Sequence, residues 1–275
     1  MISVNNKSSV GNLKVKDMSK IWRLINTGSH NGFYNMAADE AVAMACKEGR
    51  VPPTLRFYTW SPPCISIGYF QKVDRLLTQI GLEGENTEIV RRVTGGRAVF
   101  HGNDLSYSIV CNTGNRLFPR HIMGTYNKIA EAFLTGLKYL GITADPIDIQ
   151  NMRLKTRNYH HSPLCFTTAL GHEVSVNNRK LIGSAQRRWS DVFLQHGSIL
   201  MTGHQEDGGL TSISVSEILG KDPDIKAITA AICTGFLKTL GMTLIQGCLT
   251  KYEMELTEKL VEEKYSKSSW NERYV

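Results

Sequence analysis

The sequence is poor in the features that mark several classes of protein. Its 275 residues include 8 prolines and 6 cysteines, with 41% hydrophobic and 21% charged residues. Disordered, collagen-like and disulfide-scaffold proteins have different compositions, so an ordinary globular chain is predicted. No apolar run approaches the roughly 20 residues that a bilayer span needs, and no apolar signal-peptide core lies near the N-terminus. We therefore expect a cytoplasmic protein that does not enter membranes.

The cysteines are scattered, and no two of them form a C-x-x-C pair. A structural zinc site is therefore not expected, nor any other metal centre. Cys165 stands out because it follows Pro163 in a segment that also contains Arg157, His160 and His161. Cationic neighbours favour the nucleophilic thiolate, which makes Cys165 the candidate nucleophile. The remaining cysteines are predicted to be reduced packing residues. They are Cys46, Cys64, Cys111, Cys233 and Cys248.

The chain is basic, with a formal net charge of +7. Its longest basic blocks are the pairs Arg91-Arg92 and Arg187-Arg188, and no nucleic-acid-binding motif accompanies them. Because net charge favours association with the opposite sign, we expect an acidic protein partner and no nucleic acid.

The apolar pattern predicts an α+β fold. Three helices are expected where apolar residues recur at helical spacing before a glycine, over residues 33–44, 126–140 and 225–240. Strand-like segments are expected at 55–60, 64–70, 88–93, 105–111, 172–176, 180–185 and 192–200. This order favours a mixed, largely antiparallel sheet flanked by helices. From about Ser214 onward the pattern is helical and polar.

The most informative segment is Arg91–His101, which reads R-R-V-T-G-G-R-A-V-F-H. A diglycine after a strand lets the backbone turn sharply and approach a ligand closely. The arginines and His101 can donate to a phosphate or carbonyl oxygen. The alternative is a hairpin turn with exposed arginines. Neither a phosphate-binding P-loop nor a dinucleotide fingerprint is present.

A second candidate region is the hairpin predicted around Asn177-Asn178. A two-residue loop there pairs Ser175 with Lys180, and strand alternation adds Glu173 and Ser184 to the same face. Lys180 could then meet a substrate carbonyl. The alternative is an ordinary surface lysine.

These segments, in this order, resemble the biotin/lipoate protein ligase and transferase superfamily over roughly residues 22–270. The motifs that carry the resemblance are N-M-A-x-D-E-A (35–41), R-F-Y-x-W-x-P-P (56–63), S-I-G-Y-F-Q (66–71), the glycine segment 91–101, K-L-I-G-S-A-Q (180–186) and L-Q-H-G-S-I-L (194–200). The resemblance implies a fold like that of class II aminoacyl-tRNA synthetases and biotin and lipoate ligases, with an apolar acyl pocket. It divides the chain into a polar leader (1–20), a catalytic domain (21–213) and a helical C-terminal subdomain (214–275).

Within the superfamily the chain is most similar to octanoyltransferases of the Bacillus type. Cys165 lies fifteen residues before Lys180, as the nucleophile does in that subfamily. The resemblance therefore implies that Cys165 carries the acyl group and that Lys180 polarises its carbonyl. One departure is Gly102, where the family has an acidic residue. The substrate-binding residues that the resemblance implies are Arg92, Thr94, Gly95, Gly96, Arg97, His101, Gly183, Ser184, Ala185, His196 and Gly197.

The same resemblance implies no cofactor, an octanoyl acyl carrier protein as donor, and a lipoyl domain or glycine cleavage H protein as acceptor. We expect a monomer.

Three other functions stay open. An ATP-dependent lipoate-protein ligase would use ATP and Mg²⁺ and would not need Cys165, an amidotransferase would move the group between two lipoyl acceptors, and a non-catalytic lipoyl-binding module would have lost Cys165 or Lys180. A biotin ligase is disfavoured because its G-R-G-R-x-G loop is absent. Taken alone, His196 is either a core histidine or a substrate-side donor.

Overall fold

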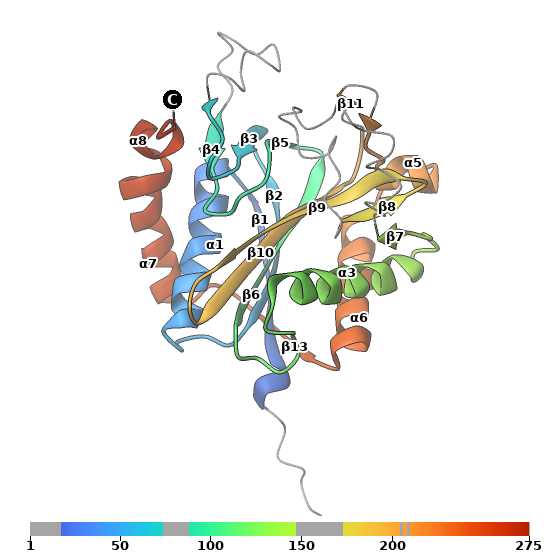
Figure 1. Cartoon of the computed structure of the whole chain (residues 1–275), viewed down its shortest axis with the longest axis horizontal. Helices are drawn as coiled ribbons and strands as arrows, with labels where there is room; N and C mark the ends of the chain where they lie inside the picture. Colours follow the sequence, from blue (N-terminus) through green and yellow to red (C-terminus); the bar gives the residue numbers. More distant parts are fainter. Residues whose placement is uncertain (1–17, 74–87, 147–172, 204–205, 208–209, 275) are drawn as a thin grey trace, which may run out of the picture.

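The computed structural model describes residues 18–73, 88–146, 173–203, 206–207 and 210–274. Its centre is an eight-stranded sheet in the order β13-β1-β2-β6-β10-β9-β8-β7 (Figure 1). The strands are β1 Ile21–His30, β2 Thr54–Trp60, β6 Asp104–Asn112, β7 Asp145–Pro146, β8 Val174–Val176, β9 Arg179–Arg188, β10 Val192–Leu200 and β13 Thr243–Gly247. β1 is parallel to both β13 and β2, and the other neighbouring pairs are antiparallel. The predicted α+β fold with a mixed, largely antiparallel sheet is confirmed.

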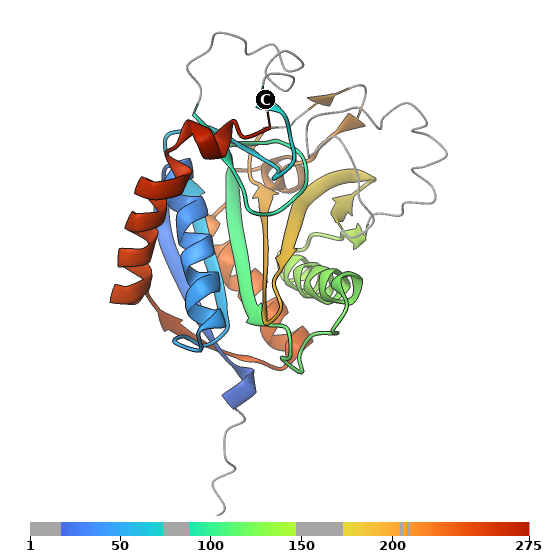
Figure 2. The same ribbon diagram turned by 60° about the vertical axis from the view of Figure 1, so that its left-hand side comes forward.

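Helices cover both faces of the sheet, so the chain forms three layers (Figure 2). α1 Gly32–Lys47 and α7 Lys251–Leu260 lie on one face, and α3 Ile122–Lys138 and α6 Ile225–Leu240 lie on the other. The three predicted helices are therefore present. None of the described helices is both long enough and apolar enough to cross a membrane.

Strand alternation sorts the side chains of the sheet between these two layers. In β2, Leu55 and Phe57 join the apolar core under α3 and α6. Tyr58 and Trp60 join the core under α1 and α7. Arg56 also points to the α1 layer, where it contacts Asp39 of that helix. The α1 face of the sheet thus carries polar groups where a plain core would have apolar ones.

A smaller sheet lies over the α1 face of the large one, near the N-terminal end of α1. Its strands are β4 Ile89–Arg91, β3 Cys64–Ile67 and β5 Val99–His101, in that order. β3 is parallel to β4 and antiparallel to β5. The small sheet therefore brings the glycine segment between β4 and β5 next to β9 and β10.

The segment after Ser214 is mostly helical, as expected, and contains α5 Val215–Leu219, α6, α7, the π-helical turn Val261–Tyr265 and α8 Ser268–Asn271. The prediction missed β13, which adds to the large sheet beside β1. α7 is also tied to β1, because the guanidinium of Arg23 lies 2.6 Å from the carboxylate of the buried Glu253. This segment consequently packs on both faces of the large sheet. Of the predicted leader 1–20, residues 1–17 lie outside the described residues.

Candidate active site

A cavity opens on the α1 face of the large sheet, beneath the small sheet. Its empty volume, open solvent at its mouth included, is about 370 Å³. The lining residues are Met36, Tyr58, Trp60, Ser66, Arg92, Val99, His101, Ser106, Gly183, Ser184, Ala185, His196, Gly197 and Ser198. Apolar walls with a few fixed polar groups suit a ligand that has an apolar chain and a polar head.

Many of the predicted substrate-binding residues meet at this cavity. Those that line it are Arg92, His101, Gly183, Ser184, Ala185, His196 and Gly197. Three more contact these lining residues: Thr94 is hydrogen-bonded to His196, and the carbonyls of Gly95 and Arg97 accept from Arg92. Gly96 lies beside β9, where a Cβ added to it would be 3.6 Å from Ala185. The cavity thus brings residues of the glycine segment together with residues of β9 and β10.

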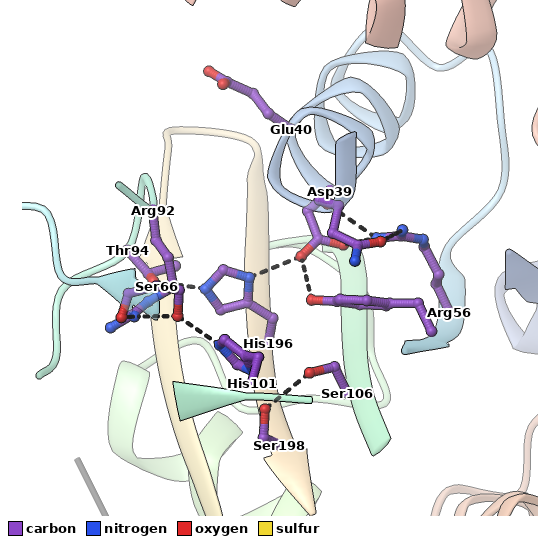
Figure 3. Close-up of polar contacts among 12 residues, drawn as sticks. Asp39, Glu40, Arg56, Ser66, Arg92, Thr94, His101, Ser106, His196 and Ser198 are labelled. Atoms are coloured by element: carbon purple, nitrogen blue, oxygen red, sulfur yellow. Dashed lines mark hydrogen bonds and ion pairs between the residues drawn. The ribbon is translucent and has the colours of Figure 1, made fainter. Parts of the chain in front are cut away.

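His196 belongs to a buried chain of hydrogen bonds that begins in α1 (Figure 3). Its Nδ1 lies 2.8 Å from Oδ2 of Asp39, and its Nε2 lies 2.7 Å from the hydroxyl of Thr94. Burial lowers the pKa of His196 despite the Asp39 carboxylate beside it. The ring is therefore neutral near pH 7, with Nδ1 donating to Asp39 and the Thr94 hydroxyl donating to Nε2. His196 is both buried and part of the cavity wall. The core-histidine and substrate-side interpretations therefore do not exclude each other.

Asp39 is the hub of this chain. Its carboxylate accepts from Arg56 at 2.6 Å and from the hydroxyl of Tyr58 at 3.0 Å, in addition to His196. Burial opposes ionisation, but Arg56 and His196 outweigh it and hold the pKa of Asp39 below its usual value. Asp39 is accordingly ionised and fixes the orientation of the His196 ring.

His101, in β5 of the small sheet, forms a second buried chain of hydrogen bonds. Its Nδ1 lies 2.9 Å from Oδ2 of Asp104, and its Nε2 lies 2.7 Å from Oγ of Ser66. The ring also stacks on Trp60, with 3.8 Å between the ring centroids. Burial and these contacts fix the position of the His101 imidazole in the cavity wall.

Asp104 lies close to Gly102, where the resemblance led us to expect an acidic residue. Gly102 has a φ of 140°, which side chains rarely adopt. Asp104, two residues further on, supplies the carboxylate to His101. Burial alone would raise the pKa of Asp104. His101, Ser198 and Ser106 outweigh this effect and hold the pKa of Asp104 below its usual value.

The arginines before the diglycine are buried and paired, so the alternative of exposed arginines at a hairpin is wrong. Arg92 donates to the carbonyl and hydroxyl of Ser66 at 2.8 Å each and to the carbonyls of Gly95 and Arg97. It therefore holds the glycine segment in a fixed curve against β3. Arg91 donates to backbone carbonyls of two separate segments, among them that of Gly68 and, at 2.6 Å, that of Asn271. Its guanidinium ties the C-terminal helix α8 to the base of the same segment.

Gly68 permits a close approach between the end of β3 and the diglycine segment. A Cβ added to Gly68 would lie 1.9 Å from the carbonyl oxygen of Gly96, far inside van der Waals contact. Gly96 itself has a φ of 91°. Only glycine at position 68 lets the glycine segment lie against the end of β3 in this way.

The hairpin that carries Lys180 has the predicted register. Ser175 pairs with Lys180, and Asn177 and Asn178 have φ values of 51° and 61°, as a tight hairpin turn requires. Lys180 is 4% exposed, so the surface-lysine interpretation is wrong. Its Nζ lies 2.5 Å from Oε1 of Glu173, which confirms that these two side chains share a face.

The same register contains a bulge that the prediction lacked. Val174 pairs with Ile182 instead of Leu181, so β9 has one extra residue beyond Lys180. Simple alternation between Lys180 and Ser184 is thereby broken. The hydroxyl of Ser184 lies 2.7 Å from that of Tyr107, whose ring packs against Phe133 of α3.

Cys165 lies outside the described residues, so its place relative to Lys180 stays a prediction. Four other cysteines are buried, as predicted: Cys46, Cys64, Cys111 and Cys233. Burial raises the pKa of Cys46 and of Cys233 to about 11, so neither thiol ionises near neutral pH. Cys248 is exposed, and its prediction as a packing residue is wrong. Among the described residues, no group of three His, Cys, Asp or Glu side chains could hold a metal ion.

Several residues of the site were not predicted from the sequence. Asp39, Ser66, Asp104, Ser106 and Ser198 all contribute buried hydrogen bonds there. One signal was available. Asp39 interrupts an apolar helix face, and Ser106 and Ser198 occupy inward positions of strands, where polar groups need partners.

The fold of the chain is that of the lipoate-ligase type. A crystal structure of lipoate-protein ligase A bound with ATP superposes with a TM-score of 0.74 at 23% identity, covering 92% of this chain and 99% of that one. A bi-partite lipoate protein ligase from Thermoplasma acidophilum, described with its E2 lipoyl domain, gives a TM-score of 0.68 at 22% identity, with 92% and 96% covered. At these identities the likeness establishes the fold alone.

The sequence comparison establishes the family. The model of the lipoyl protein ligase A/B catalytic domain matches residues 31–234, and the chain belongs to this family. Octanoyltransferase LipM of Clostridioides difficile (strain 630) is 37% identical over 271 residues, covering 92% of this chain and 98% of that protein. Octanoyltransferase LipM of Symbiobacterium thermophilum is 38% identical over 280 residues, with 93% and 100% covered. The predicted superfamily is therefore confirmed, and the chain is an acyltransferase.

Proposed function

We propose that this protein moves an octanoyl group from acyl carrier protein to a lysine of a lipoyl-accepting protein. The observation that carries the proposal is the near full-length similarity to octanoyltransferases LipM, at 37% and 38% identity. The cavity supports it, because Met36, Trp60 and Val99 give the apolar wall that an acyl chain needs. Each buried methylene of such a chain contributes about 0.8 kcal/mol.

The reaction would proceed in two acyl exchanges. The thiolate of Cys165 attacks the carbonyl of the carrier thioester, the carrier's C–S bond breaks, and the carrier leaves as a thiol. The neutral amine of the acceptor lysine then attacks the Cys165 thioester, and the Cys165 thiol leaves as the amide forms. Splitting the transfer in this way replaces one difficult step with two easier ones. Because a thioester is converted to an amide, no ATP and no other cofactor is required.

The buried chains described above would hold the acyl group in place. Lys180, as an ammonium ion, would donate to the acyl oxygen, where negative charge develops during attack. Arg92 keeps the glycine segment in its curve, and His101 and His196 fix two sides of the cavity. This division assigns substrate positioning to the described cavity, covalent capture to Cys165 and stabilisation of the developing negative charge to Lys180.

The partners would be acidic proteins. The chain carries a net charge of +7, which favours docking of negatively charged domains. The acceptor would be a lipoyl domain or a glycine cleavage H protein, since a structural neighbour is a ligase described with its E2 lipoyl domain.

The deciding experiment compares two acyl sources. Purified protein should octanoylate an acceptor domain from octanoyl carrier protein without ATP or Mg²⁺, as intact mass of the acceptor would show. A second candidate is an ATP-dependent lipoate ligase, which the fold of the ATP-bound ligase favours. Strict dependence on ATP with free octanoate or lipoate, and no reaction from the carrier thioester, would establish that ligase instead.

A further inference from the structure

Four aromatic side chains gather at the surface beside the glycine segment, and we call them the aromatic patch. They are Tyr69, Phe70, Trp270 and Tyr274. The Tyr69 ring lies edge-on to the other three rings, with centroid distances of 4.8, 5.8 and 5.9 Å. Phe70 is 73% exposed, and the other three side chains are partly exposed. Aromatic side chains gathered at a surface are typical of protein interfaces.

Two arginine side chains lie over the aromatic patch. The guanidinium of the exposed Arg273 lies 4.8 Å from the centre of the Tyr69 ring and 5.1 Å from that of Tyr274. The guanidinium of Arg187 lies 5.5 Å from the centre of the Tyr69 ring. Within the described part of the chain, neither guanidinium has a hydrogen bond or an ion pair, and Glu272 forms none with Arg273. Aromatic rings thus hold two positive groups whose hydrogen-bond donors are available to an anionic partner.

The aromatic patch adjoins the cavity. The backbone N–H of Tyr69 donates to the carbonyl of Thr94 in the glycine segment. Arg187 follows Ala185, a lining residue of the cavity, by two positions in β9, so the two side chains share one face of the strand about 7 Å apart. That face is the α1 face, because Arg187 pairs with Leu194, which belongs to the core under α1. A protein docked on the aromatic patch would therefore lie beside the cavity.

Charge distinguishes the two protein substrates of the proposed reaction. The acceptor must bring a lysine, whose ammonium ion carries the same sign as the two arginines. The donor brings an uncharged thioester on an acidic carrier domain. Opposite charges speed encounter and fix the register of an interface, whereas like charges brought together are costly. The aromatic patch with its arginines therefore fits the donor better than the acceptor.

We propose that the aromatic patch, with Arg187 and Arg273, is the docking surface for the acidic carrier domain that delivers the acyl thioester. The inference rests on the proposed function, because it names the surface that one of its substrates uses. Carboxylates of the carrier domain pair with the two guanidinium groups, and Phe70 supplies an exposed apolar contact. The surface acts on binding of the carrier domain and takes no part in breaking the thioester.

The test compares two donors that carry the same thioester. Octanoyl carrier protein has the acidic domain, and octanoyl pantetheine lacks it. In Arg187→Glu/Arg273→Glu, KM for octanoyl carrier protein should rise at least about tenfold, because two attractive contacts become repulsive. The rate with octanoyl pantetheine should stay within about twofold of the wild-type rate, because the thioester chemistry is untouched. Raising NaCl from about 0.05 M to about 0.5 M should shrink the difference in KM, since salt screens exposed charges.

Two further variants separate docking from net charge. Lys226→Glu/Lys238→Glu changes the net charge by the same amount, but both lysines are exposed on α6, which lies on the opposite face of the large sheet. This variant should leave KM for octanoyl carrier protein within about twofold of the wild-type value. Phe70→Ala changes no charge, and it should raise the same KM without altering the rate with octanoyl pantetheine.

An unchanged KM for octanoyl carrier protein, in a double variant that still uses octanoyl pantetheine, would overturn the inference. A raised KM for the acceptor alone would overturn it as well, because it would assign the surface to the acceptor. If Arg187→Glu/Arg273→Glu loses activity with both donors, the single variant Arg273→Glu, which changes one exposed side chain, decides by the same comparison. Failure of the proposed function is recognised separately, because the wild-type protein would then use neither thioester.

Discussion

His196 and Asp39 are 157 residues apart in sequence, and Nδ1 of one lies 2.8 Å from Oδ2 of the other. This contact joins β10 to α1 across the α1 face of the large sheet. Because Arg56 and Tyr58 of β2 also bind Asp39, three segments of the chain meet at one buried carboxylate. The wall of the cavity therefore depends on the charge of Asp39 and on a neutral His196.

Stability should fall as the solution becomes acidic. His196 has a lowered pKa in the folded protein, so its contribution is present above about pH 6.5 and is lost as the pH falls below that value. The pKa values of Asp39 and Asp104 are also lowered, so their contributions are lost on further acidification, below about pH 4. The urea midpoint should therefore decrease from pH 7 to pH 5, and less so in His196→Gln. A midpoint that rises over this range would contradict the assignment.

Asp39→Asn should destabilise the protein strongly. The substitution leaves the buried guanidinium of Arg56 without its charge partner, and breaking a buried pair costs about 3–5 kcal/mol. Urea unfolding of the purified variant measures this loss. Glu48→Gln is the matched control, because Glu48 pairs with Arg50 at the surface and should change the free energy of unfolding by less than about 1 kcal/mol. Similar losses in both variants would show that Asp39 is not a hub.

Gly68→Ala should disturb the glycine segment. The new Cβ would meet the carbonyl oxygen of Gly96 at 1.9 Å, so one backbone must move. Because that segment is held by Arg92 in the cavity wall, we expect at least about a tenfold loss of transfer, equivalent to roughly 1.4 kcal/mol. Gly114→Ala serves as control, since nothing lies within 4 Å of a Cβ added there. Steady-state transfer rates of the two variants check this, and equal rates would refute the close approach.

Lys180→Ala should abolish transfer and also lower stability, because the buried carboxylate of Glu173 loses its ion pair with Lys180. The two losses can be separated with Lys180→Met/Glu173→Gln, which removes both charges. This double variant should recover most of the stability, measured by urea unfolding, but no transfer. Full transfer by either variant would remove Lys180 from the mechanism.

The acyl-enzyme should form on Cys165. With octanoyl carrier protein and no acceptor, intact mass after acid quench should show one octanoyl group that hydroxylamine removes and that maps to the peptide containing Cys165. Cys165→Ala should neither label nor turn over. Cys248→Ala, which removes an exposed thiol, should do both. An adduct on another cysteine, or normal turnover by Cys165→Ala, would rule out this intermediate.

Local patterns in the sequence were enough to predict the three helices α1, α3 and α6, most strands of the sheet and the register of the hairpin at Asn177-Asn178. Helical spacing, strand alternation and turn chemistry act over a few neighbouring residues, so they can be read from the chain directly. The linked motifs likewise predicted the family and many of the residues that line the cavity.

The partners of the buried polar groups were decided only by the tertiary structure. Arg91 and Arg92 satisfy backbone carbonyls, Asp39 binds His196, and Asp104 binds His101. β13 pairs with β1 although more than two hundred residues separate them. Each of these contacts depends on how distant segments pack, because a polar side chain is stable in the interior only where folding brings it a partner. The spacing of residues within one segment carries no information about that partner.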